Sequence, residues 1–480
     1  MDLLRLLAQA SIRQWRRHPL QLVDERDLIK PWAISLVARE ALAGGLHAPG
    51  GERPTSSVLR RLDEMVISLQ DPLLLGSQES VGHDALAGYM LRSSYQQFPY
   101  QQPIFGDTAR MRPMLKRPFP RPKYQVLSDA AIEELLGADI DTYTDLAPFF
   151  LAAVMSNNGS FHRSWFDQPN FTKICEGVPK EQILKVYDTR LSAPLAAVRR
   201  AARSGRHARP ELRQHDFNPL IDSPFIILPD GTGLAPLPTF VTGRFSMAAL
   251  YYAGQNRYGT QFTIELGYVN EAYTVEQLMQ LNEAGADVHG EIMYREKKQE
   301  KSSVDGFVVY PDQVVLVEVK SLRPAMDQRL DPVSYAERLR RDIGKAKDQL
   351  VKTYNLWHNR HAAFAALPTD GRAVRGLIVV PEPLYLANHT MFGQDLGSMP
   401  FPTAVVSLTQ LEQLVAVAAA ERSGRIFEDL TAGSQYLVAD PTAALAAARE
   451  RSGVAVHRND ILDASFDAMR WQRYWNQLDQ

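Results

Sequence analysis

Two apolar runs joined by a short polar turn constrain the fold of this 480-residue chain more than any other feature. VDGFVVY covers residues 304–310 and VVLVEVK covers residues 314–320, with Pro311, Asp312 and Gln313 between them. Successive side chains of a strand point to opposite faces. Runs this apolar, with so short a connection, predict an antiparallel β-hairpin with both strands largely buried.

Further elements surround this hairpin in an order typical of an α/β layer arrangement. The Asp331-Pro332 pair predicts the start of a helix, as an N-cap followed by proline at the first helical position. The crossover through that helix allows a parallel pairing of the strand before it with the strand after it. The pattern predicts helices over 266–284, 333–357 and 409–420, strands over 288–294, 376–381 and 403–408, and a polar turn over 297–303.

The length allows two or three domains. We expect an α/β fold with a mixed central sheet flanked by helices in the C-terminal half, and a mainly α-helical N-terminal region. In chain order, the expected parts are a helical region over 1–97, a Pro- and Arg-rich linker or arm over 98–125, a mostly helical region ending in a short β-hairpin over 126–240, the α/β core over 250–421 and a helical tail over 422–480.

Composition narrows the class of protein. Apolar residues make up 45% and charged residues 22% of the chain, which excludes a wholly disordered protein. The 53 basic and 55 acidic residues give a net charge of -2, so nucleic acid must be held by a local basic patch. A single cysteine, Cys175, excludes an internal disulfide and favours a reducing cytoplasm. No apolar run reaches the length of a membrane span, so no membrane partner is expected.

Three charged groups converge where the hairpin strands meet. Glu318 and Lys320 are two residues apart and share one face of the second strand, while Asp305 begins the first strand. Two carboxylates and an amine at one strand end can hold a hard divalent cation. Such an ion polarises a phosphoryl oxygen and lowers the pKa of a bound water, which the lysine can orient. The alternative is a solvated ion pair beside an ordinary turn.

The Asp305, Glu318 and Lys320 spacing resembles the PD-(D/E)XK nuclease superfamily, which has a restriction-endonuclease-like core. The resemblance covers roughly residues 260–420, and Val304 stands where the family usually has proline. It implies Mg²⁺, with Mn²⁺ as a substitute, held by Asp305, Glu318 and the backbone carbonyl of Val319. It also implies that Lys320 positions the attacking water.

The family's other site residues map onto neighbouring elements. The acid on the helix before the first core strand would be Glu271, with Glu265 as the fallback. The helix after the second hairpin strand often lends a polar residue, here Lys345 or Gln349. Glu291 could approach the site from the strand over 288–294. For Glu271, Lys345, Gln349 and Glu291, a solvent-exposed position is the alternative.

Basic residues could hold a phosphate backbone in three places. One basic stretch spans 110–123 and another spans 199–213, and the helix over 333–357 carries a third group. Phe119 and Tyr124 could stack on bases beside the first stretch. The residues chosen as nucleic-acid contacts are Arg117, Arg121, Arg203, Arg206, Arg338 and Arg341.

The resemblance implies a metal-dependent DNA endonuclease, with a role in defence against foreign DNA or in DNA repair by family analogy. The helical N-terminal half would select the substrate, a protein partner or a second copy of the chain. Two alternatives stay open. One is a non-catalytic DNA-binding or scaffolding subunit with a relic nuclease core, and the other is an RNA-cleaving nuclease.

Overall fold

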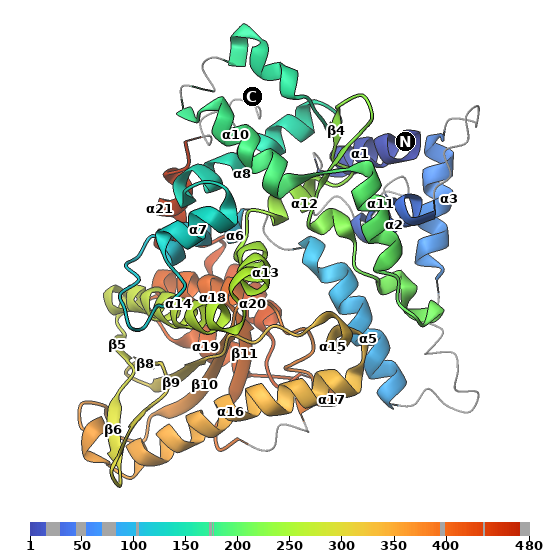
Figure 1. Ribbon diagram of the computed structural model, residues 1–480. Helices are drawn as coiled ribbons and strands as arrows, with labels where there is room; N and C mark the ends of the chain where they lie inside the picture. The colour runs from blue at the N-terminus through green and yellow to red at the C-terminus, as the bar shows by residue number, and fades with distance from the viewer. Residues whose placement is uncertain are drawn as a thin grey trace. The chain divides into compact units, whose positions relative to one another are not determined.

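The computed structural model describes residues 1–15, 29–44, 54–69, 83–101, 105–171, 175, 177–393, 399–434 and 437–470. The chain forms two compact units (Figure 1). Unit 1 comprises 1–82, 92–262 and 464–480, and unit 2 comprises 83–91 and 263–463. The expected mixture of a helical N-terminal region with a mixed sheet in the C-terminal half is confirmed.

Unit 2 is built on a mixed five-stranded sheet with the order β11-β10-β9-β8-β5. The strands are β5 (Asp287–Gly290), β8 (Gly306–Val309), β9 (Gln313–Val319), β10 (Ala373–Val380) and β11 (Thr403–Ser407). β5, β8 and β9 pair antiparallel, and β9, β10 and β11 pair parallel. The predicted hairpin and the predicted parallel crossover are therefore both confirmed.

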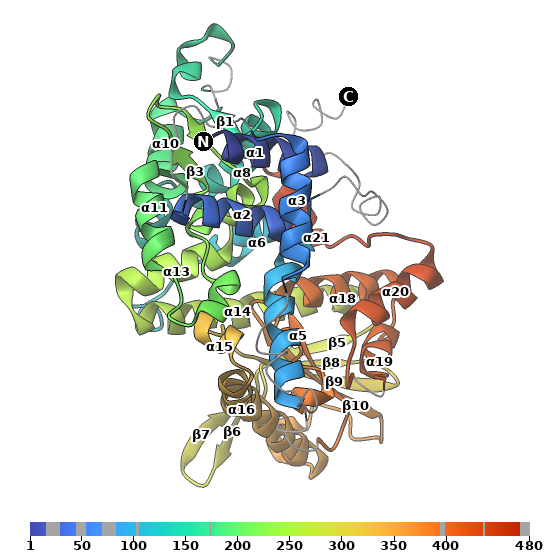
Figure 2. The same cartoon turned by 90° about the vertical axis from the view of Figure 1, so that its right-hand side faces the viewer.

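Helices cover both faces of this sheet, with α16 on one side and α14 and α18 on the other (Figures 1 and 2). Their apolar faces explain why every residue of β9 is buried. The helices of this half are α14 (Thr260–Met279), α15 (Met326–Leu330), α16 (Pro332–His358), α17 (Thr390–Gly393), α18 (Leu408–Glu421), α19 (Arg425–Thr431) and α20 (Pro441–Ser452).

Local sequence signals fix where these helices begin. The Asp331 side chain accepts a hydrogen bond from the Ser334 N–H at 3.0 Å, so the predicted N-cap of α16 is confirmed. Ser407 and Gln410 form a reciprocal capping box at the start of α18. The predicted helix over 266–284 lies within α14 and the 3₁₀ turn η8 (Gln280–Ala284).

The strand predicted over 288–294 is wrong, because it is two strands with different partners. β5 ends at Gly290, and β6 (Met293–Glu296) pairs with β7 (Gln299–Ser302) in a separate two-stranded ribbon. Because β6 and β7 pair as far as Glu296 and Gln299, the turn predicted over 297–303 contains only Lys297 and Lys298. β7 has no apolar alternation, so its backbone pairing with β6 determines its conformation.

Unit 1 is mainly helical. Its helices include α1 (Asp2–Trp15), α2 (Pro31–Gly44), α3 (Ser56–Ile67), α6 (Gly106–Leu115), α7 (Asp129–Leu136), α8 (Ile140–Ser156), α10 (Lys180–Val186), α11 (Leu195–Ser204), α12 (Pro238–Gly243) and α13 (Met247–Tyr258). Among the described residues, three helices contain residues of both units: α5 (His83–Gln97), α14 and α21 (Asp460–Asp467).

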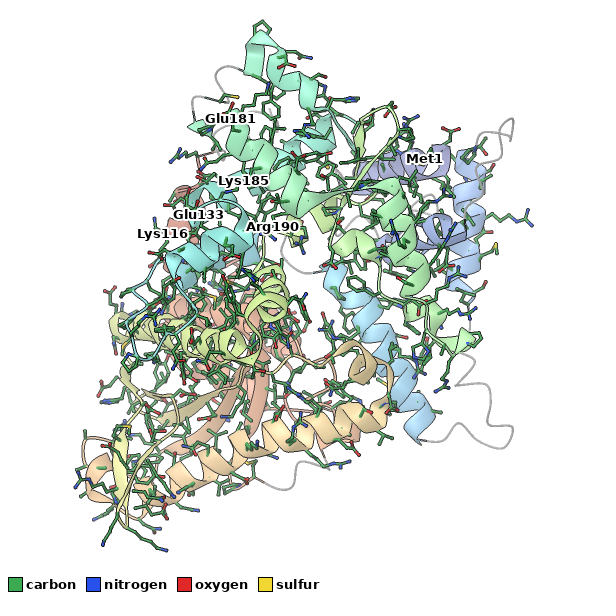
Figure 3. The ribbon with its side chains drawn as sticks, in the orientation of Figure 1. Met1, Lys116, Glu133, Glu181, Lys185 and Arg190 are labelled. Carbon is green, nitrogen blue, oxygen red and sulfur yellow. The ribbon has the colours of Figure 1, made fainter. Side chains whose placement is uncertain are left out.

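The linker or arm predicted over 98–125 is wrong for residues 106–115, which form the largely buried α6, while 116–125 lie outside any helix or strand. Arg110 is 2% exposed and pairs with Asp107. Arg112 is 7% exposed and bonds the buried Asp145, while Lys116 (Figure 3) pairs with Asp141 at 2.7 Å. The prolines and arginines of this segment predicted an extended chain. Carboxylates such as Asp145 instead neutralise the arginine side chains and allow their burial.

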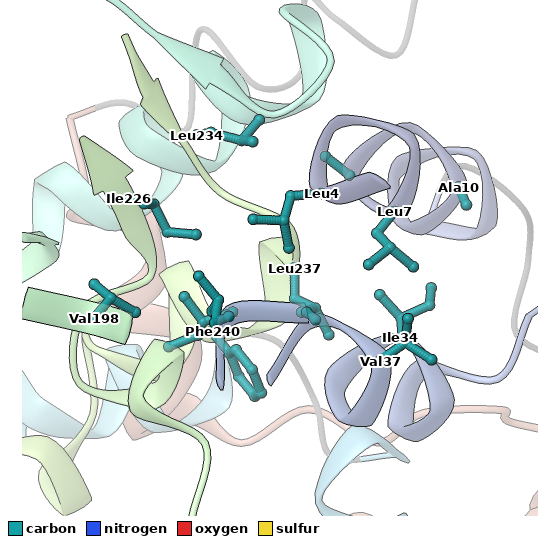
Figure 4. Close-up of a cluster of buried hydrophobic side chains, with 14 of the residues drawn as sticks. Leu4, Leu7, Ala10, Ile34, Val37, Val198, Ile226, Leu234, Leu237 and Phe240 are labelled. Atoms are coloured by element: carbon teal, nitrogen blue, oxygen red, sulfur yellow. The ribbon is translucent and has the colours of Figure 1, made fainter. Parts of the chain in front are cut away.

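A small sheet with the order β1-β4-β3-β2 completes unit 1, from β1 (Ser160–Phe161), β2 (Ser192–Pro194), β3 (Phe225–Ile227) and β4 (Gly233–Leu234). β3 and β4 are antiparallel across the turn at Gly231, as predicted for the end of 126–240. In Figure 4, Leu7 of α1 points toward Ile34 and Val37 of α2, while Leu4 points toward Leu237.

Residues 422–434 and 437–470 contain α19, α20 and α21, as the prediction of a helical tail requires, and 471–480 lie outside the described residues. Among the described residues, no helix combines the length and the apolar composition needed to cross a bilayer.

Candidate functional site

Asp305 and Glu318 meet at one end of the β8–β9 hairpin. Gly306 pairs with Val317, so the antiparallel register places Asp305 opposite Glu318. The Asp305 side chain turns over the end of β9, where its Oδ2 accepts a hydrogen bond from the Val319 N–H at 2.6 Å. The structure therefore brings together the two acids that the spacing predicted.

Lys320 continues from the end of β9. Its backbone N–H donates to the Val379 carbonyl of β10 at 2.8 Å, and its ammonium group pairs with Oε1 of Glu318. Glu318 is 5% exposed, and its second carboxylate oxygen, Oε2, is buried without a hydrogen-bond partner. A buried carboxylate oxygen with no donor is costly, and a cation or a proton would satisfy it.

Burial and like charge act on both acids. Burial raises the pKa of Glu318, with further increases from Asp305 and Glu271, and the Lys320 ammonium opposes them. Burial also raises the pKa of Asp305, where the Val319 N–H and Lys320 oppose the shift and Glu291 adds to it. Negative charge gathered in a poorly solvated place favours a bound cation.

Two further candidate acids, Glu271 and Glu291, lie near this pair. Glu271, on α14, is half-buried and close enough to raise the pKa of Glu318. Glu291 is exposed, follows the last residue of β5, and is close enough to raise the pKa of Asp305. Glu265, the fallback for Glu271, is completely buried in α14.

The two candidates on α16 have different surroundings. Lys345 is exposed to solvent. The Gln349 amide nitrogen donates to the carbonyls of Ser302 and Ser303 at 2.7 and 2.9 Å. Gln349 therefore holds the base of the β6–β7 ribbon, and its amide nitrogen is not directed at the carboxylates.

Sequence reasoning missed polar residues just beyond β9 and β10. Asn270 of α14 donates to the Ser321 hydroxyl at 2.9 Å, directly after Lys320. Arg323 and Arg329 both pair with Glu382, which follows β10. The sequence does contain a signal for these residues, because Ser321 and Arg323 follow β9 and Glu382 follows β10. The carboxyl ends of neighbouring parallel strands lie at the same edge of a sheet, so such residues are expected to lie close together.

The described residues contain no group of three or more His, Cys, Asp or Glu side chains arranged to hold a metal ion. A cation here would rely on Asp305, Glu318, a backbone carbonyl and solvent. This donor set suits Mg²⁺, which binds few carboxylates and keeps several waters.

The predicted nucleic-acid contacts on unit 1 are partly engaged within the protein. Arg117 donates to the carbonyls of Met114 and Pro113, while Arg121 is exposed. Arg203 donates to the Ala43 carbonyl at 2.8 Å, and Arg206 pairs with Glu40 at 2.9 Å. A shallow depression beside α11 is lined by Leu195, Ala196, Arg199, Arg200, Arg203 and Ser204.

The base-stacking prediction is wrong for Tyr124, which is buried, and stays a prediction for the half-buried Phe119; the two rings contact each other. Their centroids lie 5.2 Å apart in a T-shaped arrangement, and Tyr124 is 6% exposed. On unit 2, Arg338 and Arg341 both pair with Asp342, at 2.6 and 3.2 Å. Two cations share one carboxylate there, so a positive charge remains.

Comparison of the chain with protein-family models, with curated proteins and with solved structures finds no match.

Proposed function

We propose that this chain is a metal-dependent phosphodiesterase that cleaves nucleic acid at the end of the β8–β9 hairpin. One observation carries the proposal. The buried Glu318 and the half-buried Asp305 lie opposite each other beside Lys320, and one Glu318 oxygen has no hydrogen-bond donor. The resemblance of this spacing to the PD-(D/E)XK superfamily supports the same chemistry, and so does the mixed sheet with its parallel crossover.

Asp305, Glu318 and the Val319 carbonyl would hold Mg²⁺ or Mn²⁺. When bound, the ion supplies a Lewis acid for the phosphoryl oxygen and an acidified water. The Val319 N–H fixes the Asp305 carboxylate at the strand end. Lys320 provides N–H donors for the attacking water and for charge that develops on the phosphoryl group.

The test uses the full chain and supercoiled plasmid DNA with Mg²⁺, Mn²⁺ or EDTA. Asp305→Asn and Lys320→Gln are expected to lower cleavage by at least about 100-fold, the usual contribution of a positioned acid–base or charge-stabilising group. Asp312→Asn is the matched control, because Asp312 is an exposed acid at the opposite end of the same hairpin. Undiminished cleavage in both site variants would remove these residues from the mechanism.

A non-catalytic DNA-binding or scaffolding role is the second candidate, and one observation favours it. The Lys320 ammonium is already paired with Glu318, as in an inert strand-end ion pair. Calorimetric titration with Mg²⁺ and Mn²⁺ separates the two roles. A metal-dependent enzyme is expected to show saturable metal binding that the Asp305→Asn variant loses. A relic core without a metal site is expected to show no such binding.

RNA remains an alternative substrate, since the same phosphate chemistry applies to either sugar. A role in defence against foreign DNA or in DNA repair rests on family analogy alone. Single- and double-stranded RNA therefore belong in the same cleavage assay as DNA.

A further inference from the structure

The β6–β7 ribbon is a second feature of unit 2 that the chemistry at Asp305 does not explain. Its four residue pairs run from Met293–Ser302 to Glu296–Gln299. It is inserted between β5 and β8, and it projects beyond the edge of the five-stranded sheet (Figures 1 and 2). Glu291 precedes it and Asp305 follows it, so both ends of the ribbon begin at the candidate site.

Contacts with α16 hold the base of the ribbon. Gln349 donates to the carbonyls of Ser302 and Ser303, and the Thr353 hydroxyl accepts the N–H of Val304 at 3.1 Å. Isolated two-stranded ribbons are only marginally stable in water. These bonds join the ribbon to a 27-residue helix, so its base has a defined position beside the site.

Side chains on one face strengthen the same attachment. Tyr294 is 4% exposed, and its ring lies 6.1 Å from that of Phe364. Lys352 of α16 and Lys301 of β7 both pair with Glu296, at 2.7 and 2.6 Å. Contacts within the protein engage these side chains, and the other face and the tip are left for a ligand.

The tip and the outer face carry exposed cations. Arg295, Lys297 and Lys298 are exposed, and no ion pair involves them among the described residues. One acid, Glu300, lies opposite Arg295. Lys297 has a φ of +58°, a region that favours asparagine or glycine, so the turn keeps a lysine at a small conformational cost.

A stripe on α16 extends this positive surface. Arg338, Arg341 and Lys345 lie at spacings of three and four residues and continue to Gln349 and Lys352 at the ribbon. Arg338 to Lys352 spans 14 residues, about 21 Å along the helix. That length equals the rise of about six base pairs along the axis of B-DNA.

We propose that the β6–β7 ribbon enters the major groove of a B-form DNA duplex while the α16 stripe follows the neighbouring phosphates. The inference rests on the proposed function and names its substrate as double-stranded DNA. The major groove of B-DNA, about 12 Å wide, admits a two-stranded ribbon, whereas that of A-form RNA is too narrow and deep. A single strand has no groove to receive the ribbon.

The test measures binding of the full chain to one duplex DNA, the matching duplex RNA and single-stranded DNA, in EDTA so that binding is separated from cleavage. The ribbon variant is Lys297→Asn with Lys298→Gln, since asparagine tolerates the positive φ. The control variant is Arg61→Gln with Lys185→Gln, two exposed cations on α3 and α10 of unit 1 (Lys185 in Figure 3). The Lys297→Arg, Lys298→Arg variant keeps the charge.

Loss of two phosphate contacts is expected to lower duplex-DNA affinity about 30-fold at about 150 mM salt, and to reduce the salt slope by about 1.8. The control and the arginine variant are expected to match the wild type. Wild-type affinity and slope in the ribbon variant would overturn the inference, and so would equally tight, ribbon-dependent binding of duplex RNA. Cleavage is measured separately with Mg²⁺. Absence of cleavage alongside ribbon-dependent DNA binding would refute the proposed function and leave the ribbon inference standing.

Discussion

Replacing Glu318 by glutamine is expected to change how the stability of the metal-free protein depends on pH. Glu318 is 5% exposed, and burial, Asp305 and Glu271 raise its pKa above the usual value of about 4.3. The unfolded chain therefore releases this proton at a lower pH than the folded chain. The stability due to Glu318 is fully present below about pH 4.3 and is lost as the pH rises towards the raised folded-state pKa.

The size of the effect follows from linkage. In that window one group lowers the free energy of unfolding by about 1.4 kcal/mol per pH unit. Between about pH 5 and about pH 7 the wild type is expected to lose up to about 2.7 kcal/mol relative to Glu318→Gln. Coupling to Asp305 makes this an upper value, because removing one charge lowers the pKa of the other acid.

Urea denaturation in EDTA at the two pH values provides the measurement, with Asp312→Asn as the control. The control is expected to follow the wild type. Adding Mg²⁺ at ten times its Kd is expected to stabilise the wild type by about 1.4 kcal/mol and the glutamine variant by much less. Parallel pH dependence in the wild type and Glu318→Gln would refute the reasoning, because the carboxyl would then have an ordinary pKa.

Three further predictions concern unit 2. Gln349→Leu leaves two carbonyls at the ribbon base without hydrogen-bond donors, which costs about 1–3 kcal/mol of stability. This variant is expected to show faster amide hydrogen exchange in β6 and β7, whereas the control Lys345→Gln is expected to leave exchange unchanged. Hydrogen bonds from Lys301 and Lys352 lower the pKa of Glu296 to about 2. The stabilising contribution of Glu296 is therefore present above about pH 4.3 and is lost as the pH falls through about 2. An NMR titration of Glu296 with a midpoint near 4 would contradict this. Tyr273→Phe removes the 2.6 Å hydrogen bond to the buried Glu412 and is expected to lower the urea midpoint by an amount equivalent to about 1–3 kcal/mol; an unchanged midpoint would show the bond to be dispensable.

The central sheet and the candidate site were predictable because their signals are local. The two apolar runs are joined by the short turn over 311–313, and so short a connection favours an antiparallel hairpin. That hairpin alone brings Asp305 opposite Glu318. The Asp331-Pro332 pair likewise marks the start of α16 without reference to the rest of the chain.

The errors arose where distant residues decide the structure. Arg112 looked solvated in a proline-rich segment, but Asp141 and Asp145, about 30 residues later, allow its burial. The ribbon was missed because β7 is polar and its turn lacks the asparagine–glycine pair typical of tight hairpins. Its support comes from α16, nearly 50 residues further along.

The single long helix α16 would affect where such an enzyme cleaves its substrate relative to the ribbon. Bonds from one rigid rod anchor the ribbon immediately before the strand that presents Asp305. The distance between the tip of the β6–β7 ribbon and the phosphate that is cleaved would then be fixed by these hydrogen bonds and by the rigidity of the helix. We expect from that arrangement that incision would lie a constant number of base pairs from the position of the ribbon.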